Sequence, residues 1–282
     1  MVPMRNILDQ GRFMNHILED FSARSLVAAI KSNQSAWFNY LGRSPKAERC
    51  DSPEFNWVLT GLTHPILNVV LRTELTPTNV DERIAGTLAY FRSRNVTQFA
   101  WWIDPSSHPA DLGEHLLKHG LTSSDSGSGM AVDLLALNED LASPSGLTIE
   151  VVGDEKTLEG FVHASFPSFG LLDIEENACS ELLDSLGFEM PLRSYVGFLD
   201  GKPVATSQLF LDGGVAGIYW VATVPEARRQ GIGAAVSLAA LREARVMGYR
   251  IAVLGASPMG ECLYRRLGFQ EYCRMSNYMF VG

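Results

Sequence analysis

The residues Arg228-Arg229-Gln230-Gly231-Ile232-Gly233-Ala234 stand between a strand pattern and a helix pattern, and this order is the strongest structural signal in the chain. A β-rich run from Val215 to Val221 precedes the loop, and Pro225 breaks that run. Apolar residues then recur at helical spacing from Ala234 to a stop at Gly248. The local order predicted is strand, basic glycine loop, helix.

Such a loop is suited to binding a phosphate. Gly231 and Gly233 let the backbone approach a ligand closely, and the free N–H groups at the start of the following helix point toward it. Arg228 and Arg229 add positive charge in a chain whose net charge is -9. An ordinary solvated basic turn is the alternative interpretation of the two arginines.

Two familiar phosphate loops do not fit. A P-loop requires Gly-Lys-Ser/Thr, whereas Ala234 and Ala235 follow Gly233. A dinucleotide fingerprint requires a third small residue and a tight turn from strand to helix. Here residue 236 is valine, and Pro225 to Gln230 separate the strand from the glycines.

The spacing Arg228-x-x-Gly231-x-Gly233, after a strand that ends at Val221 to Pro225, resembles motif A of the GNAT N-acetyltransferases. A second strand, Tyr249 to Leu254, leads to Leu263-Tyr264-Arg265-Arg266-Leu267-Gly268-Phe269, which resembles the last helix of that family. A purely structural glycine turn is the alternative. The resemblance covers about the last 135 residues and implies a mixed α/β fold, acetyl-CoA as co-substrate and no metal.

The resemblance also implies roles for individual residues. The pantetheine arm of the cofactor would lie along the main chain of Val221, Ala222 and Thr223. The pyrophosphate would bind at the loop residues Arg228, Arg229, Gln230, Gly231, Ile232, Gly233 and Ala234. Ser257 stands where relatives often carry an asparagine that contacts the cofactor, and it keeps a hydrogen-bonding side chain.

Tyr264 matches the tyrosine that protonates the leaving thiolate in many relatives, and a phenol with a pKa near 10 is a reasonable donor for that step. A packed aromatic residue beside Leu263 and Leu267 is the alternative. The general base is not identified, because residues 217–223 contain no acid. Tyr219, Asp212, His163 and a water molecule remain open, and His163 also fits a satisfied core histidine.

The chain is expected to hold two domains in tandem. Residues 138–146 are polar and rich in helix breakers, so the boundary is placed at a linker, 141–146. Residues 98–121 echo residues 250–269 as strand, turn, helix and glycine, although two unrelated strand-helix units could coincide in this way. No glycine lies between Leu71 and Asp81. We therefore predict a degenerate GNAT-like domain at 1–140 and a catalytic GNAT domain at 147–282.

The periodicity of the remaining segments predicts further elements. Helices are expected at 12–41, 81–91, 110–119, 154–165 and 175–186. Strands are expected at 55–62, 66–71, 97–103, 147–152, 195–198 and 204–211. The serine- and glycine-rich residues 123–129 are expected to connect the helix at 110–119 to an apolar run at 130–137.

Composition limits the classes of function. The chain has no block of lysine and arginine, which argues against nucleic acid and anionic membranes as partners. Its four cysteines are scattered, and neither a signal-peptide core nor an 18-residue apolar run is present, so a cytoplasmic protein is predicted. His115 and His119 have the spacing of metal ligands but lack a third ligand.

The function predicted is acetyl transfer from acetyl-CoA to a primary amine of an unidentified small-molecule or peptide acceptor, with Tyr264 as general acid. Longer acyl groups remain a variant, because the loop reads only the CoA portion. Trp101, Trp102 and residues 166–169 could line the acceptor site, or they could be core aromatics. A non-catalytic acyl-CoA-binding or regulatory protein is the alternative. A monomer or a homodimer is expected by analogy.

Overall fold

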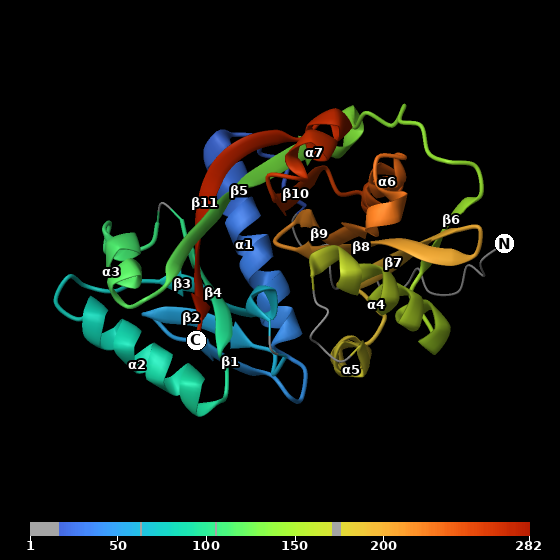
Figure 1. Cartoon of the computed structure of the whole chain (residues 1–282). Helices are drawn as coiled ribbons and strands as arrows, with labels where there is room; N and C mark the ends of the chain where they lie inside the picture. The colour runs from blue at the N-terminus through green and yellow to red at the C-terminus, as the bar shows by residue number, and fades with distance from the viewer. Residues whose placement is uncertain (1–16, 63, 105, 171–175) are drawn as a thin grey trace.

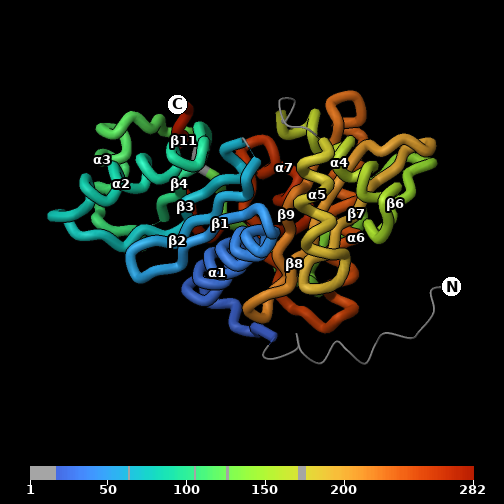
Figure 2. Tube along the Cα trace, turned by 90° about the horizontal axis from the view of Figure 1, so that it is seen from below, coloured from blue at the N-terminus to red at the C-terminus, as the bar shows by residue number. Residues whose placement is uncertain are grey.

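The computed structural model describes residues 17–62, 64–104, 106–170 and 176–282. Within these residues the strands form one mixed eleven-stranded sheet in the order β1-β2-β3-β4-β11-β5-β10-β9-β8-β7-β6. Helices cover both faces of the sheet. Helix α1 lies in the middle between two lobes, one built mainly from the N-terminal half of the chain and the other mainly from the C-terminal half (Figure 1, Figure 2). The fold is therefore a mixed α/β fold, as the sequence predicted.

The C-terminal half follows the predicted order of elements. Its strands are β6 (Leu147–Val151), β7 (Leu192–Leu199), β8 (Lys202–Asp212), β9 (Val215–Thr223), β10 (Ile251–Ala256) and β11 (Gln270–Val281). Its helices are α4 (Glu155–Phe169), α5 (Glu176–Leu186), α6 (Ile232–Val246) and α7 (Glu261–Leu267). Alternate residues of β7 and β8 enter two different core clusters, one with α4 and α5 and the other with α6 and α7. These two pairs of helices therefore cover opposite faces of the sheet.

The N-terminal half repeats part of this arrangement. Its strands are β1 (Glu48–Asp51), β2 (Phe55–Leu59), β3 (Asn68–Thr73), β4 (Gln98–Ile103) and β5 (Thr122–Asp133). Its helices are α1 (Ala23–Leu41), α2 (Val80–Ser93) and α3 (Leu112–Lys118). The order β4, α3, β5 matches the order β10, α7, β11, and β3 pairs with β4 in parallel as β9 pairs with β10. The echo in the sequence therefore corresponds to matching elements in the sheet.

The two halves exchange their last strands. β5, from the N-terminal half, pairs with β10, and β11, from the C-terminal half, pairs with β4. β5 and β11 also pair with each other, from Gln270 opposite Ala131 to Met279 opposite Thr122. The sheet thus crosses the boundary predicted at 141–146, and the division into independent domains stays a prediction.

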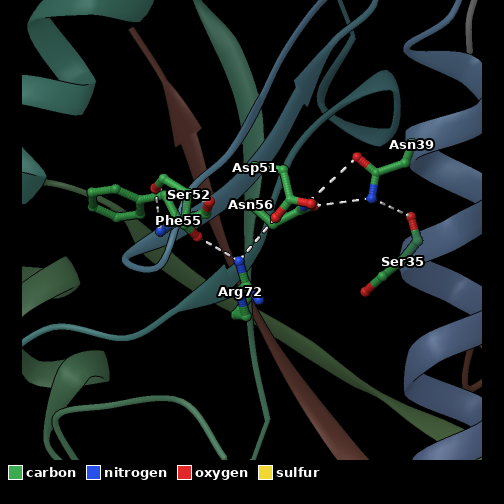
Figure 3. A network of polar contacts seen from close by, with 7 residues as sticks. All are labelled: Ser35, Asn39, Asp51, Ser52, Phe55, Asn56 and Arg72. Atoms are coloured by element: carbon green, nitrogen blue, oxygen red, sulfur yellow. Dashed lines mark hydrogen bonds and ion pairs between the residues drawn. The ribbon is translucent and has the colours of Figure 1, made fainter.

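Helix α1 is bonded to both lobes. On the N-terminal side the amides of Asn39, on α1, and Asn56, on β2, bond each other at 3.3 and 3.4 Å (Figure 3). On the C-terminal side Asn33 accepts from the Tyr219 hydroxyl at 2.7 Å. Because a buried amide is costly to leave unpaired, these bonds fix α1 in place between the lobes.

Several predicted boundaries were wrong. The first helix begins at Ala23, capped by Ser22, so residues 17–22 are not helical; residues 12–16 lie outside the described residues. The segment expected to be a connection at 123–129 lies within strand β5, and β1 was not predicted. In the described part of the chain no helix is long and apolar enough to cross a membrane.

The exchange of strands makes a prediction about fragments. Residues 147–282 expressed alone lack β5 and β4, so one edge of β10 and both edges of β11 lose their partners. We expect this fragment to be insoluble or self-associated, because unpaired strand edges template further pairing. Co-expression with residues 1–146 should restore a 1:1 complex, measured by size-exclusion chromatography with light scattering. A monomeric fragment 147–282 that unfolds cooperatively would contradict this interpretation.

Candidate functional site

Strands β9 and β10 separate where motif A begins. Their parallel pairing is confined to Ala216 with Ala252 and Gly217 with Val253. β9 then continues to Thr223, paired only with β8, while β10 pairs with β5 as far as Ala256 opposite Ser128. One backbone edge of residues 218–222 therefore has no strand partner and is suited to bond an extended ligand as an added strand would, while the carbonyl of Thr223 accepts from Arg228. Val221, Ala222 and Thr223, predicted to contact pantetheine, lie on this edge and at its end.

A bulge lies in β9 where this strand separates from β10, at the start of the opening between the two strands. Thr206 faces Ala222 and Gln208 faces Tyr219, so Trp220 and Val221 together stand opposite the single residue Ser207. Trp220 has φ +49°, a left-handed conformation that is uncommon for a bulky residue. The Thr206 hydroxyl donates to the Trp220 carbonyl at 2.8 Å and holds the bulge. Sequence analysis missed this feature, because the aromatic run reads as a regular strand.

The basic glycine loop forms the start of α6. A short turn at Pro225–Ala227 leads to Arg229 and Gly231, both left-handed with φ +63° and +82°. The first intrahelical bond runs from the Ala235 N–H to the Gly231 carbonyl. Among the described residues, nothing accepts from the backbone N–H groups of residues 229–234. This set of free donors at a helix N-terminus is suited to an anion.

The side chains of the loop leave this end of the helix open. The Arg228 guanidinium donates to the Thr223 carbonyl at 3.0 Å, which ties the loop to the end of β9. Arg228, Arg229 and Gln230 are exposed, whereas Ile232 and Ala234 are buried in the cores beneath α6. The apolar residues of the motif thus anchor the helix, while its polar residues border the free N–H groups.

The two glycines serve different contacts. A Cβ on Gly231 would collide with the carbonyl oxygen of Ala142, so the connection between the halves packs against the loop. A Cβ on Gly233 would lie 3.3 Å from Thr223 Oγ1 and 3.4 Å from Leu263. The space beside Gly233 is bordered by the end of β9 and by α7.

The connection is held along α6 by charge. Glu139 accepts from Arg242 at 2.6 Å and from Arg245 at 2.5 Å. These bonds lower the pKa of Glu139, with Arg245 as the larger cause. Residues 139–142 therefore pack beside the loop, whereas the sequence pattern predicted a domain end at 140 and a linker at 141–146.

Tyr264 lies inside the core beside the opening. It is 7% exposed, packs edge-on to Phe269 with ring centroids 5.8 Å apart, and shares a cluster with Leu254 and Ala234. No group in the described residues accepts a hydrogen bond from its hydroxyl. Burial raises the pKa of Tyr264 well above its ordinary value. The hydroxyl therefore keeps its proton and is free to donate.

Ser257, predicted to contact the cofactor, is bonded to the start of α7. Its hydroxyl accepts from the Gly260 N–H at 3.3 Å, and its carbonyl accepts from the same group at 2.8 Å. The residue follows the end of β10, so it borders the opening. Its main structural contribution is to the turn that leads into α7.

Two of the three side chains considered as a base, Tyr219 and Asp212, are placed unfavourably. The Tyr219 hydroxyl is buried and bonded to Asn33, and burial raises its pKa well above the ordinary value. Asp212 lies at the end of the β8–β9 hairpin, opposite Val215 and away from the loop; burial raises its pKa. His163 is 66% exposed on α4, so it is not a core histidine, and its nearest acid is Glu176 at 3.9 Å.

The corresponding place in the N-terminal half is closed. β3 and β4 pair only at Val69 with Ala100 and Val70 with Trp101. Beyond that point the segment before α3 fills the gap, because His108 donates to the Thr73 carbonyl and accepts from the Leu75 N–H. Helix α2 begins with Asp81 and Glu82, which repel an anion. The described residues of this half therefore offer no phosphate site at the place that corresponds to the loop.

The histidine pair on α3 is bonded to an acid. Asp81 Oδ1 lies 2.8 Å from His115 Nδ1 and 3.0 Å from His119 Nε2. These bonds, with His115 the larger cause, lower the pKa of Asp81. The described residues contain no group of three or more ligands arranged to hold a metal ion. The cluster ties α3 to α2.

Comparisons with known proteins bear on this geometry. Residues 192–271 match the family model of the acetyltransferase (GNAT) domain. A search of curated proteins finds no match.

Solved structures cover more of the chain. A GCN5-related N-acetyltransferase from Kribbella flavida is 22% identical, with 94% of this chain and 97% of that chain covered and a TM-score of 0.66. One from Sphaerobacter thermophilus is 16% identical, with 82% and 81% covered and a TM-score of 0.55. A tandem GNAT protein from the clavulanic acid biosynthesis pathway is 13% identical, with 93% and 97% covered and a TM-score of 0.54. Residues 192–271 are therefore similar to the GNAT acetyltransferase domain, and the chain has the fold of GNAT proteins, tandem ones included.

Proposed function

We propose that this protein is an acetyl-CoA-dependent N-acetyltransferase whose acceptor is a primary amine of a small molecule or peptide. The GNAT domain and the fold support acyl transfer in general. The observation that carries the proposal is the opening between β9 and β10, with free backbone N–H groups on residues 229–234 at its end. An extended ligand with a phosphate at one end fits both parts of this site.

The residues divide the binding of the cofactor between them. The edge of Val221, Ala222 and Thr223 binds the pantetheine amides as a strand binds its neighbour. The N–H groups of residues 229–234 bind the pyrophosphate, and the exposed Arg228 and Arg229 screen its charge. Acetyl-CoA supplies a thioester, whose acyl group is transferred to the amine. The bulge at Trp220 leaves the Val221 backbone outside the regular ladder, where its N–H is available to polarise the thioester carbonyl.

Tyr264 is the proposed general acid. Its hydroxyl has no acceptor among the described residues, and its raised pKa keeps the proton in place at neutral pH. It therefore donates a hydrogen bond to the sulfur as charge develops there. The proton that the attacking amine releases passes through water and replaces the one that the thiol takes as it leaves, so Tyr264 ends the cycle as a neutral phenol. The ring packing against Phe269 fixes the direction of this donor.

The amine must arrive without its proton. Strand β9 carries no acid, Tyr219 and Asp212 are placed unfavourably for this role, and His163 is exposed on α4 beside Glu176. We propose that the neutral fraction of the amine binds directly, with water as the proton acceptor. The turnover per unit of total amine then rises with pH toward the pKa of the substrate.

A non-catalytic acyl-CoA-binding protein is the second candidate. The absence of an acid on β9 favours it. Both candidates require the cofactor site, and only the enzyme requires the Tyr264 hydroxyl. We further propose a small-amine partner and a monomeric or homodimeric state.

The first prediction concerns the cofactor site. Gly233→Asp places a carboxylate beside the free N–H groups, where like charge opposes the pyrophosphate. We expect isothermal titration to show acetyl-CoA binding by the wild type and binding weaker by about 30-fold or more in this variant, a cost of about 2 kcal/mol. Gly86→Asp is the matched control, because Gly86 lies in α2 with open space around it.

Two results would contradict the proposed cofactor site. Wild-type protein that does not bind acetyl-CoA removes the basis for both candidate functions. Equal affinity in the Gly233→Asp variant places the phosphate elsewhere on the molecule.

The second prediction concerns Tyr264. Tyr264→Phe keeps the ring in its cluster and removes the hydroxyl, so we expect kcat to fall about 100-fold with an unchanged acetyl-CoA dissociation constant. Tyr90→Phe, which removes a hydroxyl bonded to Glu48 in the other lobe, should leave kcat unchanged. A thiol-release assay with an amine panel measures both. Full activity in Tyr264→Phe would assign the residue to packing alone.

A further inference from the structure

A continuous row of aromatic side chains runs from the bulge in β9 to the centre of the sheet. Phe169 contacts Trp220 at 6.0 Å between ring centroids, and Trp220 contacts Trp37 at 6.2 Å. Trp37 contacts Phe38 at 4.7 Å, and Phe38 contacts Trp102 at 6.0 Å. The row joins α4 and β9 of one half to α1 and β4 of the other.

Three buried polar atoms on this row lack a partner. They are Trp220 Nε1, Trp102 Nε1 and Asn277 Oδ1, and each is unbonded among the described residues. Trp220 is only 9% exposed. Asn277 stands directly opposite Trp102 in the β11–β4 ladder, so a donor and an acceptor lie side by side on one face. Because buried polar atoms in folded proteins are nearly always bonded, this pair points to a missing partner.

The neighbouring tryptophan shows the contrast. Trp101 points to the opposite face of β4, is fully buried, and donates from Nε1 to Thr73 Oγ1 at 2.8 Å. Its donor is satisfied within the fold, whereas that of Trp102 is not. The two residues differ by one position in the strand and therefore by which core they face.

We propose that the row binds the acceptor amine and that Trp102 and Asn277 determine its specificity. They recognise a neutral group that both accepts and donates a hydrogen bond, a hydroxyl or a carboxamide. This inference rests on the proposed acetyltransferase function. It places the amine at the bulge, where the acyl group of the cofactor is expected, and the recognised group toward the other half.

The charges near the row favour a monoamine over a polycation. Asp212, whose charge acts on Tyr219 beside Trp37, lies at the end of the β8–β9 hairpin, away from the loop. Asp104, two positions after Trp102, is paired with Lys31 at 2.8 Å. A polyamine would need unpaired carboxylates to offset the desolvation of its further charges, whereas a hydroxyl or carboxamide needs only the unpaired donor and acceptor.

The test compares four named amines with acetyl-CoA: phenethylamine, tyramine, 4-(2-aminoethyl)benzamide and spermidine. Tyramine adds a hydroxyl to phenethylamine, and 4-(2-aminoethyl)benzamide adds a carboxamide, so these two compounds distinguish the two groups. We expect tyramine, the benzamide or both to have a KM about 10-fold or more below that of phenethylamine. Spermidine should be the poorest substrate.

The variants locate the effect. In Trp102→Phe and in Asn277→Leu the KM advantage over phenethylamine should fall to about 2-fold or less with kcat little changed. In the matched control, Trp101→Phe, the advantage should persist while the melting temperature falls, because Thr73 loses its donor. The Asn277→Leu variant provides a second measurement should Trp102→Phe fail to fold.

Three results would overturn the inference: spermidine as the best substrate, no amine of the panel acetylated, or a KM advantage that survives both variants. Titration of acetyl-CoA into the same wild-type protein keeps the two proposals apart. Binding of acetyl-CoA with any of these results leaves the cofactor site standing and removes only the acceptor assignment. No binding of acetyl-CoA removes the proposed function itself.

Discussion

The backbone ladder between β5 and β11 is the interaction on which the rest of the structure depends. It joins residues 122–131 to residues 270–279, and through β4 on one side and β10 on the other it makes a single sheet of both halves. Because strand edges that are left unpaired are costly and prone to aggregate, neither half completes its sheet alone. The opening between β9 and β10 also depends on this ladder, since β5 pairs with the other edge of β10 as far as Ala256 and holds that strand in place.

The sequence predicted the local chemistry of the C-terminal half well. Proline, glycine and apolar periodicity act over a few residues, so the strand, loop and helix around Gly231 and Gly233 were found in the predicted order. The strand at 122–129 was missed because serine and glycine read as a turn. Gly129 is instead packed beneath Cys273 and Ile30, where a Cβ would collide with the sulfur. That requirement comes from residues far away in the sequence, which no local pattern reports.

The candidate site was also only partly predictable from the sequence. The residues of the basic glycine loop follow from a motif, and their free backbone N–H groups agree with it. The roles of Tyr264 and Ser257 stay predictions. The left-handed Trp220 and the contact of Ala142 with Gly231 were not predictable, because tertiary packing imposes both. Asn277 gave no signal at all in the sequence. It matters only because the exchange of strands places it beside Trp102.

The exchange of last strands has a consequence for biosynthesis. A ribosome completes β4 long before β11, and nearly the whole C-terminal half lies between them. The N-terminal half therefore leaves the ribosome with the edge of β4 open and β5 without either of its neighbours. Domains that fold one after another during synthesis avoid this exposure, whereas this chain must keep its nascent sheet from pairing with other chains until residues 270–281 arrive. Its final pairing is a late, long-range step.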